Sequence, residues 1–154
     1  MLETGYFEAA RDTVINGMAR LRDILPPGSM AFVHKIDNVL FSHGGLTESF
    51  VSHLVPDYSD DVDDLIAKIN GLGKREMWSD ASPIWARPQY GCEKPYPEGF
   101  LQVVGHTPVE KTNYSGGFLS VDSFSTHPNG DPVGDQRFVW VDTKQQQWGF
   151  SNGS

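Results

Sequence analysis

Two apolar, strand-like runs joined by a two-residue turn set the strongest constraint on the fold of this chain. The runs are residues 30–36 and 39–43, and Asp37 and Asn38 lie between them. Aspartate and asparagine tolerate positive φ, so this spacing predicts a β-hairpin. A hairpin alone is marginally stable, so further elements must cover its apolar side chains.

Three segments have the pattern of helices. Residues 7–25 repeat apolar side chains every three or four positions and end at two prolines and a glycine, which predicts an amphipathic packing helix. Shorter helices are expected over residues 47–54 and 59–69, the second stopping at Asn70 and Gly71. Aspartates at its start would cap free amides. Calcium binding there is disfavoured, because a loop starting at Asp57 places Val62 where an EF-hand needs glycine.

The second half of the chain predicts strands. Residues 78–99 are rich in proline, glycine and aromatic side chains and predict a long ordered loop with an extended piece at 83–86. Strands are expected over residues 100–105, 118–122, 137–142 and 146–150, separated by turn residues. The sequence contains no internal repeat or long linker. We therefore expect a single domain over residues 1–154, of the α+β class, built on an antiparallel or mixed sheet.

Composition excludes several classes of function. The 154 residues carry 12 basic and 20 acidic side chains, a formal net charge of −8. This balance argues against non-specific binding to nucleic acid or to an anionic membrane. No apolar run approaches the ~20 residues of a spanning helix. The first residues lack the pattern of a signal peptide, and Cys92 has no second cysteine to pair with. We expect a cytoplasmic protein without nucleic-acid or membrane partners.

Two histidines follow apolar strands and have glycine beside them. His43 ends the run at 39–43 and precedes Gly44 and Gly45, and His106 follows Gly105 after the run at 101–104. Binding residues gather at the carboxyl ends of strands, and neutral imidazole is the commonest metal ligand. Each histidine is equally compatible with a purely structural role, because their separation matches no compact zinc motif.

Three segments around these histidines resemble a known family. They are FSHGGL (41–46), IWARP (84–88) and VVGHTPV (103–109), and they look like the C-terminal half of a calcineurin-like metallophosphoesterase, in the bacterial phosphoprotein (Ser/Thr) phosphatase branch. Residues 119–143 and the leading helix also resemble that half. The family's earlier Gly-Asp-x-His, Gly-Asp-x-x-Asp-Arg-Gly and Gly-Asn-His motifs do not occur. The resemblance therefore implies part of a four-layer α/β/β/α fold, mainly the second sheet with its helices, without the N-terminal half.

The resemblance also implies a set of site residues. His43 and His106 would ligate the second ion of a two-metal site holding Mn, Fe or Zn, and Arg87 would bind the substrate phosphate. Asp122, Trp85 and Thr107 would support these groups or line the substrate cleft. Alternatives stay open for several of them. Arg87 could anchor its loop, Trp85 could pack within it, and Asp122 could cap a strand end.

The implied activity is phosphoester hydrolysis by a metal-activated water, in a complete hydrolase of which this chain supplies one part. The chain alone is expected to be inactive, because two imidazoles do not hold two metal ions. Expected partners are a phosphorylated protein or small molecule, together with the missing half or a second copy. The alternatives are a non-catalytic module that binds a partner or self-associates, and a small β-rich binding domain whose motifs are incidental.

Overall fold

The computed structural model describes residues 12–13, 15–17, 19–21, 23–58, 60–91 and 93–151, in two compact units that divide between Ala31 and Phe32. In the first unit the described residues from 12 to 24 are helical, and Leu25 N donates to Leu21 O at 2.9 Å. The predicted N-terminal helix is confirmed at these residues. Its other predicted apolar positions (Phe7, Ala10, Val14, Met18) lie outside the described residues.

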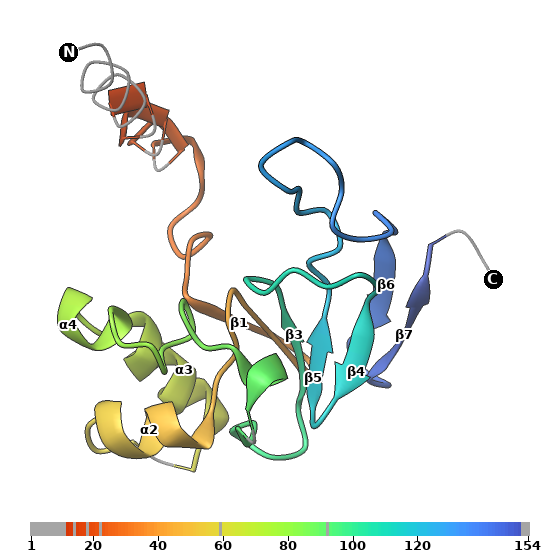
Figure 1. The fold of residues 1–154 in the computed structure, drawn as a ribbon. Coiled ribbons are helices and arrows are strands. Elements are labelled where there is room, and N and C mark those ends of the chain that lie inside the picture. The colour runs from red at the N-terminus through yellow and green to blue at the C-terminus, as the bar shows by residue number, and fades with distance from the viewer. Residues whose placement is uncertain are drawn as a thin grey trace. The chain divides into compact units, whose positions relative to one another are not determined.

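The second unit is organised around a mixed five-stranded sheet (Figure 1). The predicted hairpin is present as β1 (Val33–Ile36) and β2 (Val39–Ser42), with Asp37 at φ 49° in its turn. The remaining strands are β3 (Leu101–Val104), β4 (Asn113–Ser115) and β5 (Phe118–Ser120), and the order across the sheet is β1-β2-β3-β5-β4. Strands β2, β3 and β5 run parallel, whereas β1 and β4 are antiparallel edge strands.

Three helices follow β2. Helix α2 (Glu48–Leu54) starts at Thr47, whose side chain accepts from the amide of Phe50. Helix α3 (Val62–Asn70) starts at Asp61, which accepts from the amide of Asp64, and ends at Gly71. Both helices were predicted, and the acidic start of α3 acts as the expected cap. The short α4 (Lys74–Met77) was not predicted.

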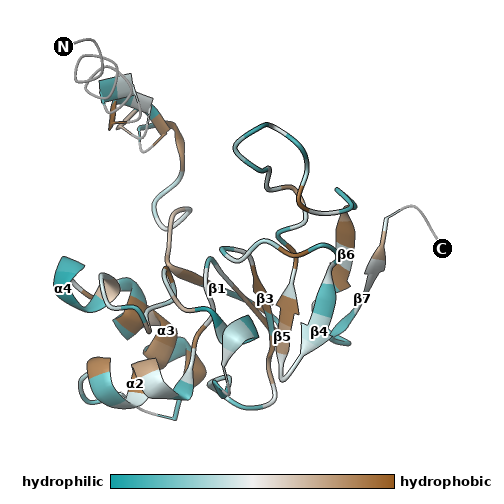
Figure 2. Ribbon diagram, in the orientation of Figure 1, coloured by the Kyte–Doolittle hydropathy of each residue, from teal (hydrophilic) through white to brown (hydrophobic). Residues whose placement is uncertain are grey.

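The sheet is covered on both faces, because alternate residues of its central strands point to opposite sides. On one face Leu40 packs with Leu46, Phe50, Leu65 and Ile69 in a fully buried core beneath α2 and α3. On the other face Val39, Leu101 and Leu119 pack against the hairpin of β6 (Val139–Asp142) and β7 (Gln147–Phe150). Figure 2 shows hydrophobic residues along β3 and β5, whereas the edge strand β4 is hydrophilic.

The α+β class is confirmed, and the specific four-layer metallophosphoesterase architecture is not. The predicted extended piece at residues 83–86 is wrong, since these residues form turns that lead into a short 3-10 helix, η1 (Pro88–Tyr90). Proline at its first position favours that start, because its fixed φ suits a helix and its missing N–H would be unpaired there. The edge strand β4 was also missed, because its three residues are all exposed.

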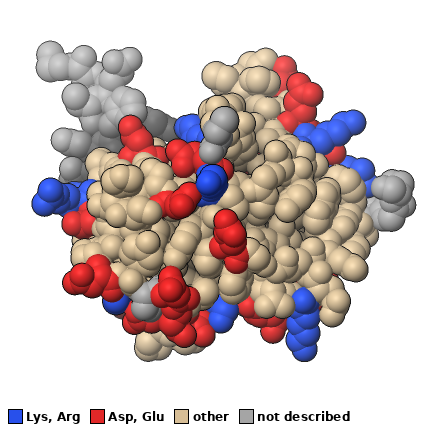
Figure 3. Space-filling view, turned by 90° about the horizontal axis from the view of Figure 1, so that it is seen from below, with Lys and Arg blue, Asp and Glu red and all other residues tan. Residues whose placement is uncertain are grey.

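The surface reflects the acidic composition, with acidic side chains gathered on the face shown in Figure 3. Within the part of the chain that the structure describes, no helix is both long and apolar enough to cross a membrane.

Candidate functional site

The parallel strands bring the predicted site residues to one edge of the sheet. Ser42 at the end of β2 is level with Val104 at the end of β3, and Val104 is level with Ser120 at the end of β5. The next residues along each strand therefore leave the sheet side by side, as carboxyl ends of parallel strands do. His43, His106 and Asp122 follow these three ends.

The turn after β2 depends on glycine. A side chain at Gly44 would place its Cβ 2.8 Å from the carbonyl oxygen of Ala86, closer than real contacts allow. Gly44 N donates to Pro83 O at 2.5 Å, and Gly45 has φ 110°. The turn that carries His43 therefore packs directly against residues 83–86, the segment just before Arg87.

The turn after β3 holds His106 in a left-handed conformation, with φ 60°. Gly105 N donates to His43 O at 2.9 Å, which continues the β2–β3 pairing beyond the strands, and Thr107 N donates to Gly105 O at 2.6 Å. A non-glycine residue at positive φ costs roughly 1–2 kcal/mol. The surrounding hydrogen bonds fix this costly backbone in place, which is common at functional sites.

The two histidine side chains contact each other directly. His106 Nδ1 and His43 Nε2 are 2.8 Å apart, so one nitrogen donates and the other accepts, and the rings meet edge to face. The other ring nitrogen of His106, Nε2, is buried without a hydrogen-bond partner. Burial, the positive charge of Arg87 and the neighbouring His43 lower the pKa of His106 below its ordinary value of 6.5, and Asp122 opposes them. His106 is therefore held neutral near pH 7.

Arg87 and Thr107 connect the central loop to the histidines. Arg87 Nη1 donates to Thr107 Oγ1 at 3.4 Å, and Thr107 is fully buried directly after His106. Arg87 itself is an exposed residue. An arginine offers five N–H donors, and the contact with Thr107 uses one of them.

Trp85 lies against the histidines from the same loop. Its ring centroid is 5.6 Å from that of His106 and 5.6 Å from that of Trp78. Both indoles are exposed, Trp85 by 38% and Trp78 by 64%. Trp85 thus packs on Trp78 of its own loop and at the same time lies beside His106.

Asp122 contributes charge to the site. Its side chain accepts from Ser125 Oγ at 2.8 Å, and its carbonyl oxygen accepts from Val109 N at 2.9 Å. Its negative charge acts on His106, where it partly reverses the fall in pKa. The structure therefore brings all six predicted residues together (His43, Trp85, Arg87, His106, Thr107, Asp122).

The predicted pair of Mn, Fe or Zn ions is contradicted. Among the residues that the structure describes, no group of three or more His, Cys, Asp or Glu side chains is arranged to hold a metal ion. The physical reason lies in the number of ligands, because His43 and His106 supply two imidazoles and two imidazoles do not hold two metal ions.

Comparison with known proteins finds similarity to solved structures, and none to family models or curated proteins. No family model matches the sequence, and no curated protein matches it. Two crystal structures titled as a cold-active protein tyrosine phosphatase, one of them a point mutant, match with TM-scores of 0.46 and 0.45 at 18% identity. Each match covers 79% of this chain, and 43% and 42% of the solved chains. A third, titled as the cold-active protein-tyrosine phosphatase of a psychrophile Shewanella species, has a TM-score of 0.42.

These findings contradict the expected membership of the calcineurin-like metallophosphoesterases, and with it the expected hydrolysis by a metal-activated water. The structures found are titled protein tyrosine phosphatases, and no family model matches. The segments behind the resemblance are five to seven residues long, and strand–histidine–glycine turns recur wherever a loop must leave a sheet tightly. The chain spans less than half the length of these structures.

Sequence analysis missed two polar residues beside the site. Gln89 follows Arg87 by two positions and donates from Nε2 to Ser120 Oγ at 3.0 Å, while its Oε1 is buried without a partner. Ser120 is buried at the end of β5. Only the fold brings these residues together, and neither belongs to a recognisable motif.

Proposed function

We propose that this chain carries the phosphoryl-binding site of a phosphatase, a hydrolase of phosphate esters. The observation that supports it is the meeting of Arg87 with the bonded pair of His43 and His106 at the carboxyl edge of the sheet. Guanidinium binds phosphate oxygens with two parallel, charge-assisted hydrogen bonds. Thr107 holds one end of Arg87, so the group is partly oriented before a ligand arrives.

In this proposal His43 is the group that exchanges a proton with the reactants. Its side chain is exposed, and its Nε2 is tied to His106. If His106 Nδ1 donates, a neutral His43 carries its proton on Nδ1 and donates to an ester oxygen. If His43 Nε2 donates, its Nδ1 is free to accept a proton from water. In the second tautomer His43 is a general base that takes a proton from water on Nδ1 and becomes an imidazolium, and in the first it holds the ester oxygen by a hydrogen bond.

His106 is the residue that positions His43. Its lowered pKa favours the neutral form of His106, which shares a hydrogen bond with His43 through Nδ1. A second positive charge beside Arg87 would be unfavourable in the empty site. A phosphate dianion supplies the opposite charge and would favour protonation of the pair.

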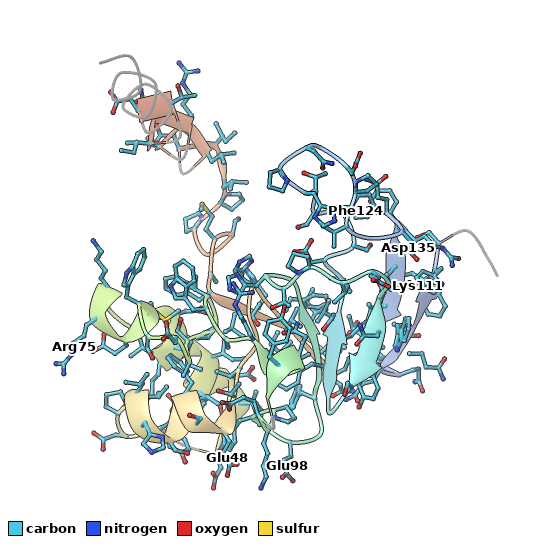
Figure 4. All side chains as sticks on the ribbon, in the orientation of Figure 1. Glu48, Arg75, Glu98, Lys111, Phe124 and Asp135 are labelled. Atoms are coloured by element: carbon cyan, nitrogen blue, oxygen red, sulfur yellow. The ribbon has the colours of Figure 1, made fainter. Side chains whose placement is uncertain are left out.

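Phosphate binding tests the site directly. Inorganic phosphate, the product of every phosphatase, is titrated into the chain and followed by phosphorus NMR. Arg87→Met should weaken binding by about tenfold or more, the loss expected for one hydrogen-bonded charge. Arg75→Met is the matched control, because Arg75 is exposed on α4 and points away from the sheet (Figure 4).

Hydrolysis is tested on a simple phosphate monoester with the same variants and with His43→Gln. Turnover that falls at least a hundredfold in His43→Gln supports the proposed proton transfer, since general acid–base groups contribute about 10²–10⁴-fold. Equal phosphate affinity in Arg87→Met and Arg75→Met would overturn the proposed site.

A further inference from the structure

We propose that a cavity beside Arg87 is a subsite for a neutral amide group carried by the phosphate ester. This inference rests on the proposed function and names part of its substrate. The cavity has a volume of about 300 Å³, and Pro88, Gln89, Val109, Phe118 and Ser120 are among its lining residues. That volume is at the small end of ligand pockets, of the size that holds one chemical group rather than a whole cofactor.

The cavity is built on the segments that also supply the phosphoryl site. Gln89 is two residues after Arg87, so their Cα atoms lie within about 8 Å of each other. Ser120 is two residues before Asp122 and ends β5. A ligand whose phosphate meets Arg87 could therefore extend its next few atoms toward Gln89.

The polar groups of the cavity define the chemistry of its ligand. Gln89 Nε2 donates to Ser120 Oγ at 3.0 Å, which leaves Gln89 Oε1 as a buried acceptor without a partner. Because Ser120 accepts in this contact, its own hydroxyl proton remains to be donated. The pair thus offers one acceptor and one donor. Exchanging the two ends of the glutamine amide still leaves one of each.

An amide group is complementary to this pair. Its N–H would donate to the glutamine oxygen, and its carbonyl oxygen would accept from the serine hydroxyl. Among the residues that the structure describes, no charged side chain lines the cavity, which disfavours a charged group there. Phe118, Pro88 and Val109 supply apolar contact for the atoms around the amide. The terminal torsion of glutamine is broad, so Oε1 can turn to meet the ligand.

An unpaired buried acceptor also marks a position where a donor group from water or from a ligand can bind. Nearly all buried polar side-chain atoms in proteins have a partner, and an orphan destabilises the fold. Elsewhere in this molecule the buried amide of Gln102 is fully paired, with Oε1 accepting from Leu46 N at 2.7 Å and Nε2 donating to two carbonyl oxygens. Gln89 differs, and a ligand amide would complete its bonding.

The test compares three small phosphate esters with inorganic phosphate in calorimetric titrations. They are ethyl phosphate, 2-hydroxyethyl phosphate and N-acetylethanolamine phosphate. We expect the amide ester to bind at least fivefold more tightly than ethyl phosphate, and Gln89→Met to abolish that preference. Gln147→Met makes the same change at an exposed position of β7 and should retain it.

Each outcome decides between the two proposals. Equal binding of the amide and ethyl esters by the wild-type chain, with phosphate still bound, overturns the subsite and leaves the phosphoryl site standing. Tighter binding of the hydroxyethyl ester overturns the choice of an amide. Failure to bind inorganic phosphate overturns both proposals. If Gln89→Met does not fold, Ser120→Ala removes the donor instead and must lose the same preference.

Two kinds of molecule could supply the amide, and a final pair of ligands separates them. Phosphoserine capped at both ends carries peptide amides, whereas N-acetylglucosamine 6-phosphate carries an N-acyl group on a sugar. Preference for the first identifies a peptide substrate, and preference for the second identifies an acylated sugar phosphate. Each result supports the amide subsite. In both cases the preference for the amide ligand must be lost in Gln89→Met.

Discussion

The region around Gln102 and the carboxyl edge of the sheet both contain buried polar side chains. Only the region around Gln102 is complete, in the sense that the polar atoms of its buried side chain all have hydrogen-bond partners. Gln102 is fully buried on the helix-covered face and uses both ends of its amide to bind the backbone at Leu46 and Tyr96. At the carboxyl edge His106 Nε2 and Gln89 Oε1 are buried and unpaired. Buried polar atoms in a stable core are paired, so the leftover atoms mark where a ligand would complete the structure.

The two regions also differ in how the chain holds its backbone. Gln102 itself lies in the regular strand β3, and its side chain ties that strand to the backbone of Leu46 and Tyr96. At the edge the backbone adopts costly conformations, with His106 at φ 60° and Gly44 pressed against Ala86. Costly local structure persists only where its surroundings impose it, and it is typical of sites that bind or react. Stability and function are thus divided between two parts of one sheet.

The largest predicted effect belongs to the complete region. Gln102→Leu keeps the volume of the side chain but leaves the amide of Leu46 and the carbonyl of Tyr96 without partners, while the carbonyl of Leu46 keeps its bond from Tyr96 N. We expect the free energy of unfolding to fall by about 3 kcal/mol or more, since each orphaned buried group costs about 1–3 kcal/mol. Urea unfolding followed by tryptophan fluorescence measures the loss, and Gln147→Leu on exposed β7 is the control. A loss below about 1 kcal/mol would show that Gln102 is not the structural clamp described here.

The sequence predicted most of the regular elements because their signals are local. The hairpin depends on Asp37 and Asn38 between two apolar runs, and the second predicted helix begins with an aspartate cap, at Asp61, although its first residue is Val62 and not residue 59. The missed elements lack such signals. β4 has three exposed residues and forms only because β5 pairs with it.

The site was predicted in part, for a related reason. Histidine at the end of a strand and glycine beside it are visible in the sequence, and they identified His43 and His106. Their direct contact depends on the register that places Ser42 level with Val104, which joins residues far apart in the chain. The metal assignment was wrong for the same reason. The short motifs indicated which residues lie at the edge, but they did not indicate which other side chains the fold would bring beside the ring nitrogens.

A smaller effect is predicted for the titration of His106. Its pKa is lowered first by burial, then by Arg87 and by His43. Arg87→Met should therefore raise the pKa of His106 toward 6.5, as measured by NMR titration of the ring signals. His43→Gln should raise it less, because His43 is the weaker of the two charge effects. If the pKa of His106 stays the same in Arg87→Met, the guanidinium does not act on the histidine pair, and this result would contradict the proposed site.

The sign of the pH dependence of stability follows from the same shift. Below pH 6.5 the unfolded chain protonates His106 more readily than the folded chain does, so the unfolded state binds more protons. Stability should therefore fall as pH drops from 6.5 toward the lowered pKa of the folded state. His106→Asn should reduce this dependence, because asparagine tolerates positive φ and does not titrate. Unfolding curves for both proteins between pH 5 and 7 measure the difference.

The smallest predicted effect concerns the incomplete region itself. Gln89→Met removes a buried acceptor that has no partner together with one neutral hydrogen bond to Ser120. These two changes oppose each other, so the free energy of unfolding should change by less than about 1 kcal/mol, far less than in Gln102→Leu. The same urea titration compares the two glutamines directly. A loss as large as that of Gln102→Leu would mean that Gln89 is a structural clamp too, and the contrast between the two regions would fail.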